Sequence, residues 1–197
     1  MPFHLGLTGS IGMGKSTTAK LFAEAGCDIW DADAAVHRLY APDGAAVGPL
    51  GAEFPAAIVD GGVNRARLKE IIAADPTALK RIETIVHPLV AADRESFRKS
   101  ATSDILVFDI PLLFETGGNA RMDAVACVSV DPDTQEQRVL DRGTMTKEQF
   151  LMIREKQMPD GEKRARADYV IITDTLDHAR EQVKNIVADI RARLSDA

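Results

Sequence analysis

The chain has 197 residues, of which 45% are hydrophobic and 27% charged, and its formal net charge is −6. That length fits one α/β domain with insertions, and that composition excludes wholesale disorder. The acidic balance argues against a bulk nucleic-acid binder, which needs a basic surface to displace counterions.

Two further classes of protein are disfavoured by what the chain lacks. Cys27 and Cys127 are far apart and show no CxxC spacing, so we expect two small buried side chains rather than a disulfide or a thiolate zinc site. The first ten residues do not have the form of a signal peptide, and no run of about 18 apolar residues predicts a membrane span. We therefore expect a cytosolic protein without nucleic-acid or membrane partners, as a monomer or weak homo-oligomer.

The first predicted elements are a short strand, a glycine-rich turn and a helix. Residues 4–8 are an apolar strand candidate, and residues 16–25 follow as a helix that Gly26 is placed to end. Between them, GSIGMGKS at residues 9–16 matches the phosphate-binding pattern G-x-x-x-x-G-K-[ST] completely. A strand before the loop and a helix after it are the context that this motif requires.

This motif predicts a site for the phosphates of ATP. Gly9, Gly12 and Gly14 let the backbone bend so that several N–H groups converge on one anion, at the positive end of the helix that follows. Lys15 supplies an ammonium for the β- and γ-phosphates, and Ser16 supplies a hydroxyl for Mg²⁺. The expected nucleotide-binding set is Gly9, Ser10, Ile11, Gly12, Met13, Gly14, Lys15, Ser16 and Thr17.

A second strand candidate ends near Trp30 and leads into Asp31-Ala32-Asp33. A carboxylate at this end of a parallel sheet can face the γ-phosphate and accept a proton from an attacking hydroxyl. Both acids are also candidate helix N-caps, because residues 34–40 can be helical and Asp is a favoured cap. We favour the cap for Asp31 and catalysis for Asp33.

The rest of the chain alternates strands with helices, which implies a parallel sheet covered on both faces. Apolar runs predict further buried strands at residues 105–109, 124–130 and 169–173, and a long amphipathic helix ends the chain. Residues 34–103 are far longer than the roughly dozen residues a crossover needs, so we predict an inserted helical subdomain there. One of its helices is expected to open at Asp75-Pro76.

Four residues carry open alternatives. Asp109, at the end of the 105–109 strand, is either the acid that assists magnesium or a strand-end cap. Arg138 and Arg142 lie four apart, so on a helix they share a face that could close over the transferring phosphoryl group; a solvated basic face is the alternative. His87, before Pro88, is either structural or functional.

Residues 146–149 lack the Asn and Asp of a guanine-reading element, which disfavours a GTPase switch. Within them, Thr146 and Gln149 predict a capping box at the start of a helix.

Taken together, these motifs resemble the dephospho-coenzyme A kinase family. The segments that carry the resemblance occur in the family's order and cover almost the whole chain. The Pro-Leu-Leu-Phe-Glu and Ala-Asp-Tyr-Val-Ile segments are much more specific than the phosphate loop, which many kinases share. The segments are LTGSIGMGKST at residues 7–17, DAD at residues 31–33 with His37 shortly after, IVHPLV at residues 85–90, DIPLLFE at residues 109–115 and KRARADYVI at residues 163–171.

The resemblance implies an α/β P-loop kinase core with a parallel five-stranded sheet covered by helices on both faces, plus an inserted helical substrate domain and a lid. It implies transfer of the γ-phosphate of ATP, with Mg²⁺, to the ribose 3′-hydroxyl of dephospho-coenzyme A, giving coenzyme A and ADP in the final step of coenzyme A biosynthesis. The expected parts are a core of residues 1–33, 104–137 and 168–197, a substrate domain of residues 34–103 and a lid of residues 138–167.

At matching positions, the resemblance makes Asp33 the proposed base and Arg142 the lid arginine, and it places Arg81 and His87 in the acceptor-binding stretch. We expect Lys15 and Arg142 to stabilise the moving phosphoryl group, Arg138 to help bind the nucleotide, and Ser16 and Asp109 to hold the metal. Three departures from the family's pattern are Met13 in place of a small residue, Thr173-Asp174 where an Asn often stands nearby, and the atypical residues 158–161. The rival readings are another small-molecule kinase on the same core and a non-enzymatic nucleotide switch.

Overall fold

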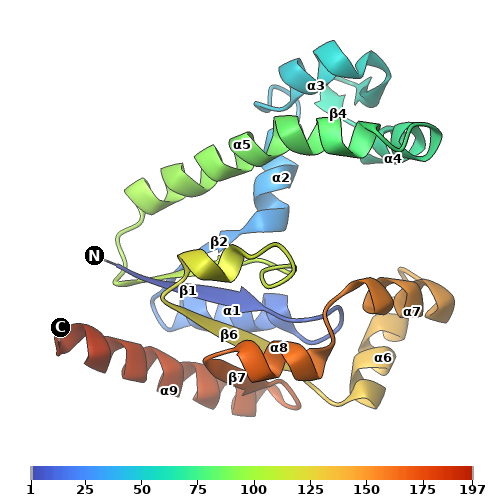
Figure 1. Ribbon diagram of the computed structural model, residues 1–197. Coiled ribbons are helices and arrows are strands. Elements are labelled where there is room, and N and C mark those ends of the chain that lie inside the picture. Colours follow the sequence, from blue (N-terminus) through green and yellow to red (C-terminus); the bar gives the residue numbers. More distant parts are fainter. Residues whose placement is uncertain (1, 197) are drawn as a thin grey trace. The chain divides into compact units, whose positions relative to one another are not determined.

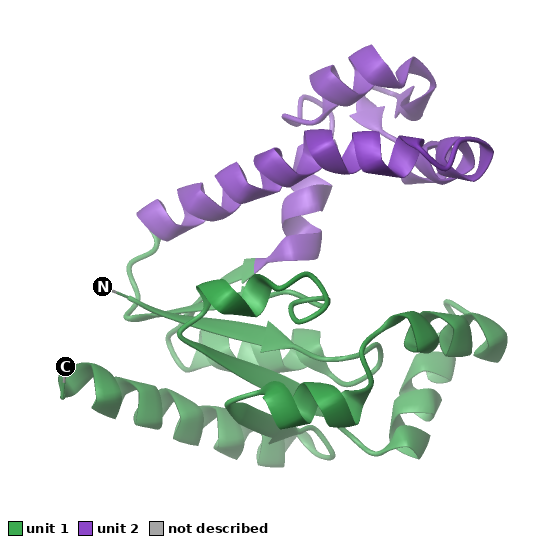
Figure 2. Cartoon of the chain, viewed as in Figure 1, with its two compact units in different colours: residues 1–30, 101–197 green, residues 31–100 purple. Residues whose placement is uncertain are grey.

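The computed structural model describes residues 2–196, and these divide into two compact units (Figure 2). Unit 1 takes in the described residues up to Trp30 and from Ala101 onward, and unit 2 is Asp31–Ser100. No helix among residues 2–196 is long and apolar enough to cross a bilayer.

Unit 1 is built on a five-stranded sheet with β1 at its centre (Figure 1). The strand order is β2-β5-β1-β6-β7, and β1 runs parallel to both β5 and β6, as β6 does to β7. The apolar runs identified in the sequence therefore form the predicted parallel sheet. The strands are β1 (Phe3–Thr8), β2 (Asp28–Asp31), β5 (Ile105–Asp109), β6 (Ala124–Ser129) and β7 (Tyr169–Ile172).

One face of this sheet packs against α1 (Lys15–Glu24) and α9 (Leu176–Ser195). Each helix turns an apolar stripe toward the sheet. These side chains and those of every second strand residue form one continuous core. Both cysteines lie in buried positions and are free, as expected, and burial raises the pKa of Cys27 to about 11 and of Cys127 to about 12. Core members include Leu5, Leu7, Phe22, Val107, Val128, Ile171, Val183 and Ile190.

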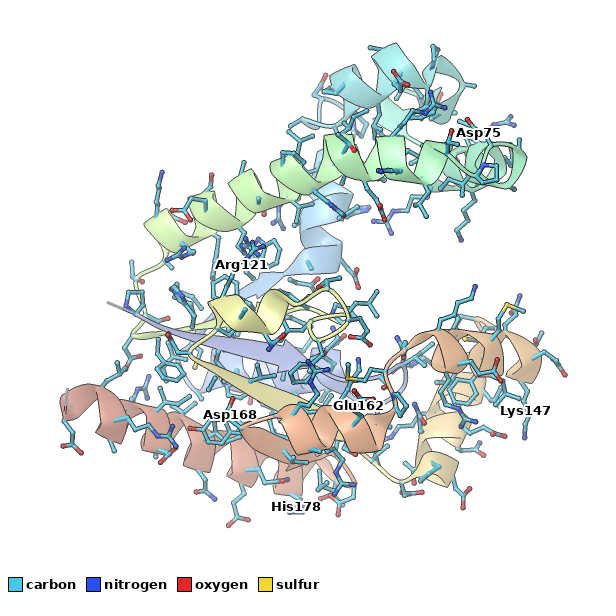
Figure 3. The ribbon with its side chains drawn as sticks, in the orientation of Figure 1. Asp75, Arg121, Lys147, Glu162, Asp168 and His178 are labelled. Carbon is cyan, nitrogen blue, oxygen red and sulfur yellow. The ribbon has the colours of Figure 1, made fainter. Side chains whose placement is uncertain are left out.

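The opposite face is covered by the turn after β5, with η2 (Gly118–Arg121), and by α8 (Asp160–Arg166). Gly6 in the central strand makes room for this layer, because a Cβ there would lie 2.6 Å from Cδ2 of Leu113. Asp168, just before β7, accepts a hydrogen bond of 2.8 Å from the backbone N–H of Val125 (Figure 3). The predicted fold class, a parallel sheet covered on both faces, is confirmed.

Between β6 and β7, α6 (Pro132–Asp141) and α7 (Lys147–Lys156) precede α8. The predicted capping box at the start of α7 is present, because the Thr146 hydroxyl accepts from the Gln149 N–H while the Gln149 side chain accepts from the Thr146 N–H. The use of residues 138–167 as a lid stays a prediction.

Unit 2 contains α2 (Ala32–Tyr40), α3 (Val47–Glu53), η1 (Pro55–Ala57), α4 (Arg65–Ala74) and α5 (Ala78–Ser100) around its own apolar core. It also contains an antiparallel hairpin of β3 (Ile58–Val59) and β4 (Gly62–Val63), which the expectation of a helical insertion missed. The hairpin turns at Asp60 and Gly61, both with positive φ (49° and 77°). Asp-Gly is a favoured pair for such a turn, because both positions need left-handed backbone.

The helix expected to open at Asp75-Pro76 begins at Ala78 instead. The Asp75 carboxylate accepts hydrogen bonds from the Thr77 N–H (2.9 Å) and hydroxyl (2.7 Å), so it caps the turn that leads into α5 (Figure 3). The Asp-Pro pair thus marks the approach to the helix rather than its first turn.

Candidate active site

The loop between β1 and α1 bends at the two glycines nearest the helix. Gly12 and Gly14 have φ values of 80° and 91°, a left-handed region that other residues enter only with strain. Gly9 is needed for a different reason: a Cβ there would lie 2.3 Å from Cγ2 of Val128 on the neighbouring strand. The backbone bend predicted for Gly12 and Gly14 is confirmed, and Gly9 instead allows close packing against β6.

The helix that follows the loop begins at Lys15 and has no side-chain cap. Gly14 is the N-cap residue, and the first turn holds no acidic side chain. The N–H groups of a first helical turn have no partner within the helix, and the helix dipole adds partial positive charge there. This end of α1 is therefore suited to an anion such as a phosphate.

Lys15 and Asp109, singled out separately in the sequence, are brought together. The Lys15 ammonium forms an ion pair with the Asp109 carboxylate. Asp109 ends β5, which lies next to β1, and its side chain is only 1% exposed. This ion pair holds the phosphate-loop lysine at the carboxyl edge of the sheet.

Arg138 lies at the same edge of the sheet and contacts it through Thr173, whereas Arg142 does not. Arg138 donates to the Thr173 hydroxyl (3.1 Å) and carbonyl (2.6 Å), and the Thr173 hydroxyl in turn donates to the carbonyl of Met13 (2.7 Å). Arg142 is the exposed C-cap residue of α6 and makes no side-chain hydrogen bond or ion pair with residues 2–196. The two arginines therefore occupy different environments.

Met13 turns its side chain into the protein. It is 2% exposed, and its sulfur accepts a hydrogen bond from the N–H of Val130 (3.2 Å). A thioether is a weak acceptor that fills irregular gaps, so methionine suits this position. The departure noted at Met13 therefore leaves the backbone of the loop accessible to a ligand.

Two glutamines that sequence reasoning missed hold one peptide group on each side of Ile11. The Ile11 N–H donates to Oε1 of Gln157 (3.1 Å), and Nε2 of Gln135 donates to the Ile11 carbonyl (2.7 Å). Gln157 is the C-cap residue of α7 and Gln135 lies in α6. No local pattern signals either contact, because each joins residues more than 100 positions apart.

A buried ion pair fixes the loop that follows Asp109. The ammonium of Lys163, which is 0% exposed, lies 2.9 Å from Oε1 of Glu115 and donates to the Pro111 carbonyl (3.1 Å). Burial acts to raise the pKa of Glu115, but hydrogen bonds from Lys163 and the Met158 N–H outweigh it and lower that pKa below its ordinary value. Both partners fall in the segments that carried the family resemblance, yet sequence alone gave neither a role.

A cavity of about 720 Å³ opens beside the phosphate loop within unit 1. It extends from Ser10 and Met13 to residues of α7 and α8, including Arg154 and Arg164. Asp160, also in its wall, accepts a hydrogen bond from the Ser129 hydroxyl (2.7 Å). The volume is in the range of small-molecule and cofactor sites.

The candidate residues of unit 2 lie at the start of α2 and in α5. Asp31 caps α2, because its carboxylate accepts from the Ala34 N–H (2.9 Å), and Asp33 is exposed in the first turn. The cap expected for Asp31 is confirmed, and the catalytic role of Asp33 stays a prediction.

Arg81 and His87 both belong to α5. Arg81 is held by the carboxylates of Asp75 (2.8 Å) and Glu53 (2.7 Å) and lies over the Phe54 ring at 4.9 Å. His87 is exposed. The structure therefore gives Arg81 a structural ion-pair network, and the acceptor contacts expected for both residues stay predictions.

Comparison with known proteins gives one consistent answer. A family model described as dephospho-CoA kinase matches residues 3–178. The dephospho-CoA kinase of Ruegeria pomeroyi is 70% identical over 192 residues, covering 98% of each chain, and that of Cereibacter sphaeroides is 60% identical over 190 residues, covering 96% of each.

Among solved structures, a protein from Thermus thermophilus has a TM-score of 0.85 at 32% identity, covering 95% of this chain and 97% of that one. The dephospho-CoA kinase from Campylobacter jejuni has a TM-score of 0.69 at 22% identity, covering 96% and 98%, and so shares the fold.

Proposed function

The chain belongs to the dephospho-CoA kinase family, and we propose that its phosphate loop holds the donor while Asp33 activates the acceptor. It is an ATP-dependent kinase that phosphorylates dephospho-CoA in coenzyme A biosynthesis. The observation that carries the proposed division of roles is the ion pair of Lys15 with Asp109 at the edge where Gly12 and Gly14 bend the loop.

On the donor side, residues 9–17 form the loop that binds the phosphates of ATP through the positive end of α1 and through backbone N–H groups other than that of Ile11, which donates to Gln157. The Lys15 ammonium pairs with the negative charge of the β- and γ-phosphates. Arg142 adds a second positive charge as phosphoryl transfer proceeds. Arg138 supports the nucleotide from the end of β7, where it already contacts Thr173. These groups lower the barrier because they face the negative charge that develops in the transition state.

The residues at the edge of unit 1 also fit a magnesium ion. Among residues 2–196 no cluster of three or more His, Cys, Asp or Glu could hold a metal alone, and Mg²⁺ is typically held by one or two protein oxygens together with substrate phosphates. The Ser16 hydroxyl and the Asp109 carboxylate are oxygen donors of that kind. When bound, Mg²⁺ would neutralise phosphate charge, and we assign its support to Ser16 and Asp109.

On the acceptor side, Asp33 orients the ribose 3′-hydroxyl of dephospho-CoA and accepts its proton. In a loose transition state that proton moves late, so the carboxylate acts mainly by orienting the hydroxyl. We assign residues 34–103 to acceptor binding, with Arg81 and His87 as the contacts expected by resemblance. Residues 138–167 would close as a lid and exclude water, which would otherwise compete for the phosphoryl group.

An assay of ADP release with and without dephospho-CoA tests these roles together. We expect ADP release to depend on the acceptor, to stop on chelation with EDTA and to recover with added Mg²⁺. Full activity in EDTA would remove the assigned magnesium site. A panel of other small-molecule acceptors, with product analysis, establishes how strongly the site prefers dephospho-CoA.

A further inference from the structure

A side chain from α6 holds the peptide group between Ile11 and Gly12 of the phosphate loop. Nε2 of Gln135 donates to the Ile11 carbonyl at 2.7 Å, and Gln135 is only 3% exposed. A carbonyl oxygen can only accept a hydrogen bond, so the side-chain amide of Gln135 must present its nitrogen here. The contact therefore fixes the direction of one carbonyl in the loop.

A second side chain from outside the loop holds the peptide group between Met13 and Gly14. The Thr173 hydroxyl donates to the Met13 carbonyl at 2.7 Å, and Thr173 is buried. Thr173 follows β7 whereas Gln135 belongs to α6, so the two contacts come from separate elements. They share one pattern, because each holds the carbonyl that precedes a glycine.

The direction of each carbonyl also sets the direction of the N–H in the same peptide group. A trans peptide group is planar, and its C=O and N–H bonds point in opposite directions. The N–H groups of Gly12 and Gly14 therefore point away from the side chains that hold the carbonyls. Neither N–H donates to an atom of residues 2–196, although Gly12 is buried. A buried N–H without a protein partner calls for another acceptor.

Glycine makes these two peptide groups the easiest ones in the loop to turn over. Gly12 and Gly14 have φ values of 80° and 91°, and glycine adopts negative φ about as readily as positive φ. Rotation of the peptide plane before a glycine exchanges these regions and turns the carbonyl to where the N–H had been. A carbonyl in that place would repel an anion, so a contact that holds the carbonyl keeps a donor aimed at the phosphates.

The other two N–H groups of this stretch are used inside the protein. The Ile11 N–H donates to Oε1 of Gln157 (3.1 Å), and the Met13 N–H donates to a carbonyl of the loop itself (3.2 Å). Engaged and available donors thus alternate along the loop. The available ones belong to Gly12 and Gly14, the two residues whose preceding carbonyls are held from outside.

We propose that Gln135 and Thr173 are positioning residues for the nucleotide. By holding two carbonyls, they aim the N–H groups of Gly12 and Gly14 at the phosphates of the donor. The inference rests on the proposed donor role of residues 9–17, and it names the side chains that prepare that loop. Neither side chain has to touch the nucleotide, because the effect passes through a rigid peptide plane.

Amide hydrogen exchange, followed by NMR with saturating ADP or adenosine, tests the proposal. ADP carries phosphates and adenosine does not, so in the wild type only ADP should slow exchange at the Gly12 and Gly14 amides, by about tenfold. Thr173→Val removes the hydroxyl donor, and the effect of ADP should then be lost at Gly14 and kept at Gly12. Gln135→Met removes the amide donor and should give the reverse pattern.

Calorimetry measures the matching change in affinity. Thr173→Val and Gln135→Met should each raise the Kd for ADP about tenfold, the loss of one charge-assisted hydrogen bond, and leave the Kd for adenosine within about twofold. Thr173→Ser keeps the hydroxyl and should recover most of the affinity. Thr116→Val is the matched control, because it removes a hydroxyl that donates to the Leu112 carbonyl (2.8 Å) outside the phosphate loop. It should leave both Kd values within about twofold.

The exchange data separate the ways in which the proposal can fail. If ADP protects both glycine amides equally in the wild type and in the two variants, the positioning role is overturned while the donor role of the loop stands. If ADP protects neither amide in the wild type, the donor role fails and the inference fails with it. Equal loss at both amides in each variant would also overturn the proposal, because a general disturbance of the loop would then account for the result. Gln135→Met is an independent test if Thr173→Val does not fold.

Discussion

The edge of unit 1 next to the phosphate loop is already held by side chains, whereas the proposed base of unit 2 is exposed. In unit 1, Lys15 pairs with Asp109, and Thr173 contacts the loop backbone. In unit 2, Asp33 and His37 are exposed. A preorganised site needs no rearrangement as charge develops, so we expect the paired residues at the edge of unit 1 to be in place before the donor binds and the exposed residues of unit 2 to gain their partners from the substrate.

This difference has a consequence that mutations can measure. Substitutions of the paired residues in unit 1 should lower both activity and the free energy of unfolding, because the same contacts serve both. Substitutions of the exposed residues in unit 2 should lower activity or acceptor affinity with little change in stability.

Lys15→Met should lower both the activity and the free energy of unfolding. We expect kcat to fall about 10²- to 10³-fold, as for other preorganised charges removed from an active site. Loss of the ammonium beside the buried Asp109 carboxylate should also lower the free energy of unfolding by about 3 kcal/mol. ADP-release kinetics and urea denaturation measure the two effects, and Lys20→Met, at an exposed position of the same helix, is the control. Lost activity at unchanged stability would contradict the shared role.

Glu115→Gln tests the contrast through stability and pH. Removing the carboxylate that pairs with buried Lys163 should lower the free energy of unfolding by about 3 kcal/mol at pH 7. The control Glu70→Gln, in the exposed pair with Arg67, should lower it by at most about 0.5 kcal/mol. Because the folded-state pKa of Glu115 is lowered, its contribution is complete above the ordinary value of 4.5 and is lost as pH falls through the folded-state pKa. Urea denaturation from pH 7 to pH 3 should show the difference shrinking; a constant difference would contradict the assignment.

Gly14→Ala separates backbone strain from effects on the site. Gly14 and Gly117 both have positive φ (91° and 68°), so an alanine should cost about 1–2 kcal/mol of stability at either position. A Cβ at Gly14 would also lie 3.1 Å from the Thr173 hydroxyl, whereas at Gly117 it would meet nothing within 4 Å. We expect only Gly14→Ala to raise the KM for ATP, by about tenfold. Equal KM values in the two variants would place the loop outside the donor site.

Gln135→Glu and Gln157→Glu form a matched pair with opposite hydrogen-bond polarity. The Ile11 carbonyl requires a donor from position 135, while the Ile11 N–H requires an acceptor from position 157. A carboxylate therefore keeps the contact at 157 and loses it at 135, although both variants add the same charge. We expect the KM for ATP to rise several-fold more in Gln135→Glu than in Gln157→Glu, measured by ADP release. The reverse order would show that the added charge, not the hydrogen bond, controls the loop.

Features with local causes could be predicted from the sequence. The strands follow from apolar runs, the loop bend from Gly12 and Gly14, and the Asp31 cap from a favoured residue before a helical segment. The Asp60-Gly61 hairpin also carried a local signal, an Asp-Gly pair beside apolar residues, and it was missed because the insertion was treated as helical.

Contacts between distant positions could not be predicted in this way. In the sequence, Lys163 is one of several basic residues in a charged segment, which predicts an exposed side chain. In the structure it is fully buried against Glu115. Gln135 and Gln157 carry no pattern, because their partner Ile11 is fixed only by the tertiary fold. The same holds for Arg138, whose expected place over a phosphate depends on the position of Thr173. The roles of Asp33, Arg142, Arg81 and His87 stay predictions.

Turnover of Asp33→Asn, measured beside its equilibrium affinity for ATP, tests the central claim most directly. The residue is exposed in the first turn of α2, so asparagine should keep the fold and the Kd for ATP within about twofold while kcat falls about 10²- to 10⁴-fold. Near-normal kcat in that variant would contradict the assignment of Asp33 as the group that activates the acceptor hydroxyl.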